Sequence, residues 1–400
     1  MIKQQDIICV GLPNWEGDYM KTIVEMMSVW ARHNRVLYVD YEYTYKDVFT
    51  AFLKKNNVPV KRIIGLENRL RCLMLKDNSE IHVLTPPAVL PVNWIKAEGI
   101  YRSLQHLNAQ RVKKAILKAK RRLGFQNPLV INAFNPFYGL PLLGQLGEAL
   151  NIYYCYDEIS AAHWCKTHGA DLEVEFMEAV DVVITSSEGL YEKKKVFNPN
   201  TYLVKNGVNF ELFHQAYQTL KPYSDRKTIG YIGSLDDRID YDLLEYCIWR
   251  SPEYDYVFLG RINSEAGKAS LAKYPNVKLL GSKSPTELPE YLRKFDLGII
   301  PFVKNEFTKG IYPLKINEYL AAGIPVVATN FAPMSDFEDI ITLADDPEVF
   351  LQSIHWELQI NDAEKTALRI QTARSNAWES RAEQLSDILE GHLKHFSFQN

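Results

Sequence analysis

The sequence predicts an α/β protein of two domains, each built around a parallel sheet. The chain has 400 residues, too many for one ordinary hydrophobic core and suited to two domains of near-equal size. Short apolar segments alternate with helical patterns along the chain, and a second series begins after Asn206-Gly207. Such alternation is typical of parallel sheets covered by helices.

The candidate strands are short, rich in β-branched or aromatic residues, and bounded by Gly, Pro, Asn or Asp. In the first half they are residues 7–12, 35–41, 81–84, 129–132, 152–156, 182–185 and 202–205. In the second half they are residues 228–232, 256–259, 277–280, 297–301, 326–328 and 340–343. Helices are predicted over 17–33 and, as one amphipathic segment, over 362–394.

The composition is that of a globular protein, and a formal net charge of −3 gives no pull toward nucleic acid. Five scattered cysteines lack any Cys-x-x-Cys pair, so we expect reduced thiols in a cytoplasmic protein. The first apolar run, residues 7–12, is too short for a signal peptide, and nowhere do about 18 apolar residues run together.

The most informative segment is 312–329, Tyr-Pro-Leu-Lys-Ile-Asn-Glu-Tyr-Leu-Ala-Ala-Gly-Ile-Pro-Val-Val-Ala-Thr. It predicts a helix opened by Pro313 and closed by Gly323, followed by a buried strand. Lys315 and Glu318 lie on neighbouring faces of that helix. A helix N-terminus with a lysine attracts a phosphate, and a carboxylate one turn deeper accepts ribose hydroxyls, which predicts a nucleoside diphosphate site. The alternative is an amphipathic helix whose two charges are only solvated.

A Gly-Ser turn follows the strand 228–232. Gly233 would let the backbone approach a diphosphate closely, with its own N–H group and that of Ser234 as donors. Arg261 and Ser282 lie in loops after the next two strands, where the nucleobase is expected at the carboxyl ends of the sheet.

Segment 312–329 resembles the donor-binding helix of nucleotide-sugar glycosyltransferases of the GT-B architecture (group 1 or family 4 type). Asn206-Gly-Val-Asn-Phe is similar to that family's hinge element. The resemblance implies two Rossmann-like domains whose sheets face across a cleft, with a C-terminal helix that crosses back. It assigns the acceptor domain to residues 1–207, the donor domain to 208–374 and the returning helix to 375–400.

The sequence departs from the family's pattern in two places. Arg238 can take the role of an arginine that follows the turn, but Asp240 and Tyr241 stand where a lysine is expected, which shifts phosphate binding to Lys315 and Lys309. Gly310 stands where the family usually has a sugar-binding Glu. The loop through Gly310 and Ile311 is therefore expected to bind the donor through backbone N–H groups.

Two Asp-Asp pairs raise a metal-binding alternative, since metal-dependent transferases bridge a diphosphate with Asp-x-Asp and Mg²⁺ or Mn²⁺. Neither Asp236-Asp237 nor Asp345-Asp346 follows a strand in that manner, and the second pair with Pro347-Glu348 is a better helix start. We therefore expect no metal and no cofactor, with the nucleotide-diphosphate sugar as substrate.

The best candidates for chemistry follow the strand 152–156, which ends in Asp157-Glu158. This strand end is similar to the one that carries the base in inverting GT-B glucuronosyltransferases of exopolysaccharide assembly, which implies Asp157 as general base and Glu158 as reserve. The alternative is an Asp that caps the next helix. Acceptor contacts are expected from Trp15, Glu16 and His163.

Residues 111–125 carry seven cations and no acid beside an apolar stripe. This is a basic amphipathic helix of the kind that lies on anionic lipid, unless its stripe packs on the sheet. With the resemblance, the sequence predicts a metal-independent glycosyltransferase, cytoplasmic and peripheral on the inner membrane face. It would move a sugar, from a UDP-sugar by preference, to a glycan or lipid-linked acceptor in cell-surface polysaccharide synthesis such as the teichuronic-acid type. The alternatives are a UDP-sugar 2-epimerase and a non-catalytic sugar- or nucleotide-binding protein.

Overall fold

The structure is a computed structural model that describes residues 1–17, 21–54, 58–161, 165, 167–219, 224–360 and 362–397. The chain folds into two units. Unit 1 holds the residues up to Lys205 together with those from Arg381 onward, and unit 2 holds Asn206–Ser380. The predicted domain boundaries stood at 207/208 and 374/375.

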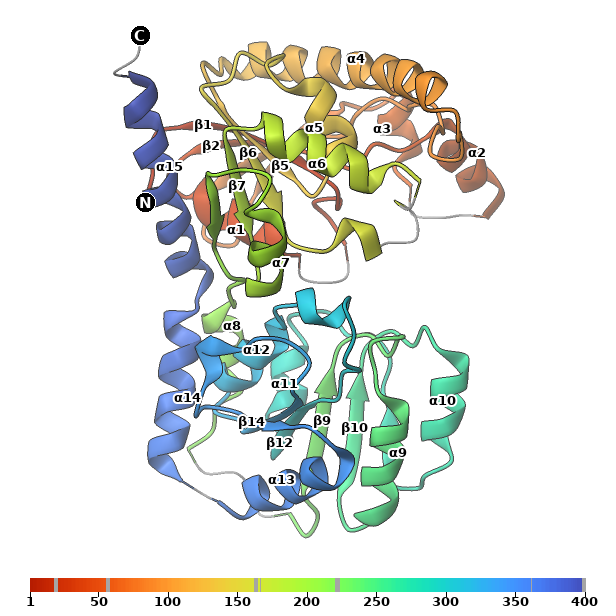
Figure 1. Cartoon of the computed structure of the whole chain (residues 1–400), viewed down its shortest axis with the longest axis vertical. Coiled ribbons are helices and arrows are strands. Elements are labelled where there is room, and N and C mark those ends of the chain that lie inside the picture. The colour runs from red at the N-terminus through yellow and green to blue at the C-terminus, as the bar shows by residue number, and fades with distance from the viewer. Residues whose placement is uncertain are drawn as a thin grey trace. The chain divides into compact units, whose positions relative to one another are not determined.

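Unit 1 is built on an eight-stranded sheet in the order β3-β4-β2-β1-β5-β6-β7-β8. Figure 1 labels five of these strands, β1, β2, β5, β6 and β7. The strands are β1(Asp6–Gly11), β2(Arg35–Val39), β3(Leu70–Met74), β4(Glu80–Leu84), β5(Leu129–Ala133), β6(Leu150–Cys155), β7(Val182–Thr185) and β8(Thr201–Leu203). All pairs are parallel except β3 with β4. The sequence analysis predicted parallel sheets and did not include β3, the antiparallel strand at this edge. β3 contains no β-branched residue and is partly exposed, so its strand signal is weak.

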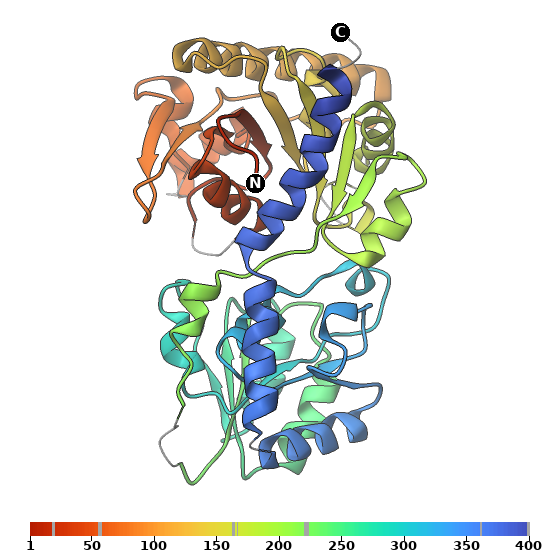
Figure 2. The ribbon, with the colours of Figure 1, turned by 90° about the vertical axis from the view of Figure 1, so that its left-hand side faces the viewer.

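Helices surround this sheet. They are α1(Thr22–Ala31), α2(Tyr45–Lys54), α3(Val60–Ile64), α4(Glu98–Leu123), α5(Pro136–Leu142), α6(Gly169–Ala179), α7(Glu188–Lys194) and most of α15(Trp378–Ser397), with a short 3-10 helix η1(Ile159–Ala161). Figure 2 shows α15 in dark blue along unit 1, where the Trp30 indole N–H donates to the Ala382 carbonyl at 3.3 Å. Helix α1 begins at Thr22 and not at residue 17 as predicted, and the ammonium of the residue before it, Lys21, donates to the carbonyls of Asn14 and Glu16.

Unit 2 has a six-stranded parallel sheet in the order β11-β10-β9-β12-β13-β14. Its strands are β9(Thr228–Ile232), β10(Asp255–Leu259), β11(Val277–Leu279), β12(Leu297–Ile300), β13(Val326–Thr329) and β14(Thr342–Ala344). Its helices are α8(Phe210–His214), α9(Tyr241–Arg250), α10(Glu265–Ala272), α11(Leu288–Leu292), α12(Leu314–Ala321), α13(Pro347–Gln359) and α14(Ala363–Ser375), with 3-10 helices η3(Thr308–Gly310) and η4(Ser335–Phe337). Helix α9 packs against α10 and α13, and α12 packs against α8 and α14 (Figure 1).

The start of α13 and the break between α14 and α15 bear on two predicted helices. Asp346 caps α13 by accepting the N–H groups of Glu348 and Val349, as expected from Asp345-Asp346-Pro347-Glu348. The helical segment predicted over 362–394 is instead two helices. The chain leaves the helix between α14 and α15 because Ala377 forms a bridge to Val208, whose carbonyl accepts the Trp378 N–H at 3.1 Å.

Candidate functional site

The sheet of unit 2 has a topological switch point, a place where the strand order reverses. From β9 the chain adds β10 and β11 on one side, and then places β12, β13 and β14 on the other. At this point, the loops that follow two neighbouring strands lead away from each other. Open α/β sheets bind ligands in the crevice between those two loops. In this unit the segments in question begin at Gly233, after β9, and at Pro301, after β12.

Helix α12 is fixed over this point by Tyr319. The Tyr319 hydroxyl accepts the N–H of Ile232, the last residue of β9, at 2.8 Å. Its ring occupies the space left by Gly298, where an added Cβ would lie 2.7 Å from the ring. Lys315 precedes Tyr319 by four residues and therefore lies on the same side of the helix. Packing at Tyr319 thus brings Lys315 to the switch point.

Lys315 is held by two aromatic residues, Tyr231 in β9 and Phe302 in the segment that follows β12. Its Nζ donates to the Tyr231 hydroxyl at 2.9 Å and lies 4.4 Å from the Tyr231 ring centroid and 4.7 Å from that of Phe302. Burial lowers the pKa of Lys315 to about 7, and the charge of Arg238 acts in the same direction, against smaller effects of Glu318 and Asp236. A bound anion would favour the charged ammonium, so the site is suited to a phosphate.

The turn at Gly233 differs from its predicted role. Its φ of +135° favours glycine, and an added Cβ would lie 2.6 Å from Lys315 Nζ. The Gly233 N–H donates to the Leu259 carbonyl at 2.8 Å, which continues the pairing of β9 with β10 by one residue. The prediction that this N–H binds a phosphate is therefore wrong. The Ser234 N–H has no hydrogen-bond acceptor within the described part of the chain and stays a candidate donor.

Arg238 faces the same Phe302 ring as Lys315, with its Cζ 5.7 Å from the ring centroid. Asp236 orients the guanidinium by accepting from Nε at 2.9 Å and from Nη2 at 2.6 Å. Burial alone would raise the pKa of Asp236, but the hydrogen bonds and charge of Arg238, with Lys315, hold it below its usual value. Two cations and one fixed carboxylate therefore meet around one aromatic ring.

Glu318 lies on α12 one turn after Lys315, and only 8% of it is exposed. The preceding loop cannot act as predicted. The N–H groups of Lys309, Gly310 and Ile311 donate to the carbonyls of residues 305, 307 and 308, at 3.0, 3.2 and 3.0 Å. These N–H groups are therefore already bonded within residues 305–311, and the prediction that the Gly310 and Ile311 N–H groups bind the nucleotide-sugar is wrong.

The remaining residues predicted for the donor are exposed. Arg261 and Ser282 lie on the loops after β10 and β11, and the Arg261 carbonyl accepts the Leu235 N–H at 2.9 Å. Lys309 Nζ lies 3.9 Å from a Glu306 carboxylate oxygen. No hydrogen bond or ion pair links these three side chains to Lys315 in the residues that the structure describes, so their roles stay predictions.

Comparison with known proteins identifies unit 2. Residues 226–359, which run from just before β9 to the end of α13, match the family model of glycosyl transferases group 1. Unit 2 carries a group 1 glycosyltransferase domain. The Lys315 site thus lies inside the glycosyltransferase domain, and the family predicted from segment 312–329 is confirmed for this unit.

A relative and two solved structures extend the comparison. TuaH of Bacillus subtilis (strain 168), named as a teichuronic acid biosynthesis glycosyltransferase, is 26% identical over 222 residues, 50% of this chain and 56% of TuaH. The chain thus spans little more than half the length of that relative. The catalytic domain of starch synthase IV from Arabidopsis thaliana, bound to ADP and acarbose, superimposes with a TM-score of 0.65 at 11% identity, over 98% of this chain and 100% of that one. A UDP-forming α,α-trehalose-phosphate synthase from Burkholderia xenovorans gives 0.66 at 11% identity, over 97% and 99%. These structures confirm the predicted GT-B fold class.

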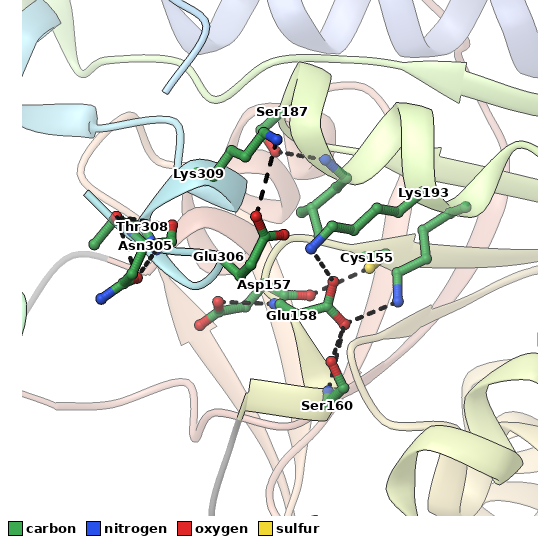
Figure 3. Close-up of polar contacts among 12 residues, drawn as sticks. Cys155, Asp157, Glu158, Ser160, Ser187, Lys193, Asn305, Glu306, Thr308 and Lys309 are labelled. Carbon is green, nitrogen blue, oxygen red and sulfur yellow. Dashed lines mark hydrogen bonds and ion pairs between the residues drawn. The ribbon is translucent and has the colours of Figure 1, made fainter. Parts of the chain in front are cut away.

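The predicted base lies in unit 1, outside the glycosyltransferase domain match. Asp157 follows β6 by two residues, is half-buried, and accepts the Glu158 N–H through Oδ1 at 2.8 Å. Glu158 has a different environment, shown in Figure 3. Its carboxylate is buried, lies 3.1 Å from Lys194 Nζ and 3.7 Å from Lys193 Nζ, and accepts from the Ser160 hydroxyl at 2.9 Å.

Glu158 is therefore part of a buried ion cluster. Lys194 Nζ also lies 2.7 Å from Glu173, so one lysine joins two carboxylates. Burial alone would raise the pKa of Glu158, but the Lys194 charge and the Ser160 and Lys194 hydrogen bonds hold it below its usual value. A carboxylate held ionised by two lysines is a weak proton acceptor. Asp157 stays the better candidate base.

The predicted acceptor residues are placed only in part. The Trp15 N–H donates to the buried Asp40 at 2.7 Å, and its ring packs edge-on against Tyr38, so the ring is half-buried. Glu16 is exposed and ion-pairs with Arg71 at 2.9 Å and Arg62 at 3.7 Å. The hydrogen bond from Arg71 lowers the pKa of Glu16. His163 lies outside the described residues.

The basic segment 111–125 begins in the middle of α4, and its residues 111–123 form the second half of that helix. Its apolar stripe does not face solvent: Val112, Ile116 and Ala119 are buried in the core of unit 1. Of the two alternatives given above, packing of the stripe inside the domain is confirmed, so these side chains are not available to contact lipid. The cations Arg111, Lys114, Lys118, Arg121 and Arg122 remain exposed.

Within residues 1–397, apart from the gaps named above, no group of three or more His, Cys, Asp or Glu side chains is placed to hold a metal ion. Over the same residues, every helix is too short or too polar to cross a membrane.

Sequence reasoning missed the aromatic and acidic parts of the site. Tyr231 and Phe302 look like core residues at strand ends, and Asp236 was considered only as a metal ligand. Their position in the sequence could have indicated the site, since all three residues lie at or just after the end of a strand at the switch point.

Proposed function

We propose that the chain transfers a sugar from a nucleoside diphosphate donor, UDP by preference, to a glycan or lipid-linked acceptor in cell-surface polysaccharide synthesis. The observation that carries this proposal is the pair of cations, Lys315 and Arg238, around Phe302 at the switch point of the glycosyltransferase domain. A diphosphate leaving group needs such charge to stabilise it. Glu318, one turn along α12, is proposed to bind the ribose hydroxyls.

The donor and the setting draw support from the relatives. One solved neighbour is named as UDP-forming and another was bound to ADP, and TuaH is named for teichuronic acid biosynthesis. We favour UDP and a metal-independent reaction. Lys315 and Arg238 would then supply the positive charge that a bound metal ion supplies in metal-dependent transferases. The proposed place of action is the cytoplasmic face of the membrane.

The direct test is calorimetric titration of the protein with UDP, GDP, CDP and ADP, first in EDTA and then with Mg²⁺. Binding of UDP in EDTA is expected. Glu318→Ala should weaken that binding by about 2–4 kcal/mol, because two charge-assisted hydrogen bonds are lost. Glu290→Ala, at an exposed position of α11, is the matched control, and Glu318→Gln serves if Ala impairs folding. Unchanged affinity in a folded Glu318 variant would remove the ribose assignment.

Asp157→Asn tests the general base. The variant should keep UDP affinity and lose turnover by about 10²–10⁴-fold, because a side-chain amide cannot accept the acceptor's proton. Turnover is followed as UDP release from a UDP-sugar with a crude glycolipid acceptor. Full turnover in Asp157→Asn would point to a retaining reaction or another base. Interconversion of the UDP-sugar without acceptor would instead identify a 2-epimerase, and binding without turnover a sugar- or nucleotide-binding protein.

Membrane contact is proposed to use α2 and not the apolar stripe of α4. On α2 the side chains of Tyr45, Phe49, Phe52 and Leu53 are 45, 66, 70 and 69% exposed, at a spacing that puts them on one face. Arg111 of α4 donates to the Tyr45 hydroxyl at 2.7 Å, which joins this apolar face to the exposed cations of α4. Apolar side chains beside a row of cations fit an anionic lipid surface.

Flotation with vesicles of phosphatidylglycerol and phosphatidylcholine tests this surface. The double variant Phe49→Ser, Phe52→Ser should bind the vesicles at least about tenfold more weakly, because it lacks two aromatic side chains whose transfer from water into the lipid surface favours binding. Trp249→Ser, at a residue of α9 that is 66% exposed, is the control. Equal binding by the double variant would exclude α2 as the contact. Loss of self-association in that variant would instead identify a second copy of the chain as the occupant.

A further inference from the structure

Unit 1 contains a cavity of about 300 Å³ that the proposed function has not used. It is lined by residues that follow three neighbouring strands: Leu12 after β1, Tyr41 and Glu42 after β2, and Asn135 and Phe137 after β5. In the sheet, β1 lies between β2 and β5, so strand order reverses here, as it does at β9 in unit 2. The cavity therefore stands where an open α/β sheet binds a ligand, and its volume is within the range of small-molecule sites.

Glu42 is the distinctive group of this cavity. Only 4% of the residue is exposed. Its Oε2 accepts from the Asn135 side-chain N–H at 3.1 Å, whereas Oε1 is buried without a hydrogen-bond partner in the described residues. Burial raises the pKa of Glu42 to about 8, with a smaller contribution from Asp40. A buried oxygen without a partner is unfavourable unless a ligand or water supplies one.

The backbone that places Asn135 is strained. Phe134 has a φ of +56°, a left-handed conformation that a residue with a bulky side chain rarely adopts. This turn directs the chain so that the Asn135 N–H donates to Asn132 Oδ1 at 3.0 Å while its amide reaches Glu42. Strain of this kind persists where the surroundings enforce it, and it clusters at binding sites.

The walls of the cavity combine aromatic and polar surface. Tyr41, Trp94, Phe137 and Tyr138 contribute rings, and Glu42 and Asn135 contribute the inner polar groups. The charged residues Lys46 and Asp47 also line it, and the Asp47 carboxylate accepts the N–H and hydroxyl of Thr44 at 2.7 Å. Aromatic faces with few inner hydrogen-bonding groups suit a ring that is apolar on its C–H faces and polar at its edge.

We propose that this cavity binds one neutral sugar ring of the acceptor and that Glu42 Oε1 forms a hydrogen bond with one of its hydroxyls. The proposal rests on the proposed function, because a glycosyltransferase needs an acceptor subsite. It assigns Glu42 a binding role, and the proton of the acceptor hydroxyl remains with the candidate base, Asp157.

Saturation-transfer NMR tests the subsite with three ligands: methyl α-glucoside, methyl α-mannoside and methyl N-acetyl-β-glucosaminide. At least one should receive saturation from the wild-type protein. Glu42→Ala should weaken its binding at least about tenfold. Leu90→Trp, which fills the cavity while leaving Glu42 in place, should abolish the signal. Glu80→Gln, at an exposed carboxylate of β4, is the control.

Parallel titration with UDP separates the two proposals. If UDP binds and no glycoside does, or if Glu42→Ala and Leu90→Trp leave glycoside binding unchanged, the subsite proposal is overturned and the proposed function is not. If a glycoside binds in a Glu42-dependent way and no nucleotide binds, the subsite stands and the proposed function fails. Because Leu90→Trp keeps Glu42, the test does not depend on the folding of Glu42→Ala.

Discussion

Replacing Lys315 with Met is expected to weaken UDP binding by about 2 kcal/mol, roughly 30-fold, because a charge-assisted contact to the diphosphate is lost. Met keeps the packing of the side chain between the Tyr231 and Phe302 rings. Titration calorimetry at pH 7 measures the loss. Lys278→Met is the matched control, since Lys278 is exposed, pairs with Asp255 at 2.8 Å, and lies on the edge strand β11, which β10 and β9 separate from β12.

The same lysine should make UDP binding depend on pH. The pKa of Lys315 is lowered to about 7, so above that pH the free protein holds a largely neutral amine. Binding of a diphosphate then requires proton uptake, and affinity should fall by up to about tenfold per pH unit between pH 7.5 and 8.5. The measured heat should also change with the ionisation enthalpy of the buffer. Both effects should vanish in Lys315→Met; if they persist there, another group carries the linkage.

Glu42→Gln is expected to stabilise the protein at alkaline pH. The folded chain holds the Glu42 proton up to about pH 8, whereas the ordinary value for a Glu is 4.5. The folded state therefore binds more protons than the unfolded state between these values, and the stability of the wild type falls as pH rises through this window. Gln does not titrate and can still accept from Asn135. The stability difference in favour of Glu42→Gln should grow by roughly 3–5 kcal/mol between pH 5 and pH 9.

Urea unfolding followed by tryptophan fluorescence at pH 5, 7 and 9 measures this difference. Other titrating groups are shared by both proteins and cancel in the comparison. Glu80→Gln, at the exposed position on β4, should run parallel to the wild type at all three values. If the free energy of unfolding of Glu42→Gln also ran parallel to that of the wild type from pH 5 to pH 9, Glu42 would ionise normally in the folded chain.

The sequence by itself determined the features that depend on neighbouring residues. The helix and strand of 312–329, the Asp346 cap and the placing of Lys315 and Glu318 one turn apart all follow from spacing within about ten residues. The α/β fold class could also be predicted, because alternation of strands and helices is a property of the chain's pattern. The family of unit 2 was predicted from the resemblance of segment 312–329 to a known donor-binding helix.

The tertiary structure decided which polar groups are free and which faces are covered, since those partners lie far away in the sequence. The Leu259 carbonyl accepts the Gly233 N–H that a phosphate was expected to accept, and carbonyls of residues 305–308 accept the N–H groups before α12. The core of unit 1 buries the apolar stripe of α4 and leaves Tyr45, Phe49, Phe52 and Leu53 of α2 exposed. Glu42 meets Asn135 across 93 residues, and only that meeting makes it a buried acid in a cavity. Spacing along the chain sets which side of a helix a residue occupies; long-range packing sets what that side touches.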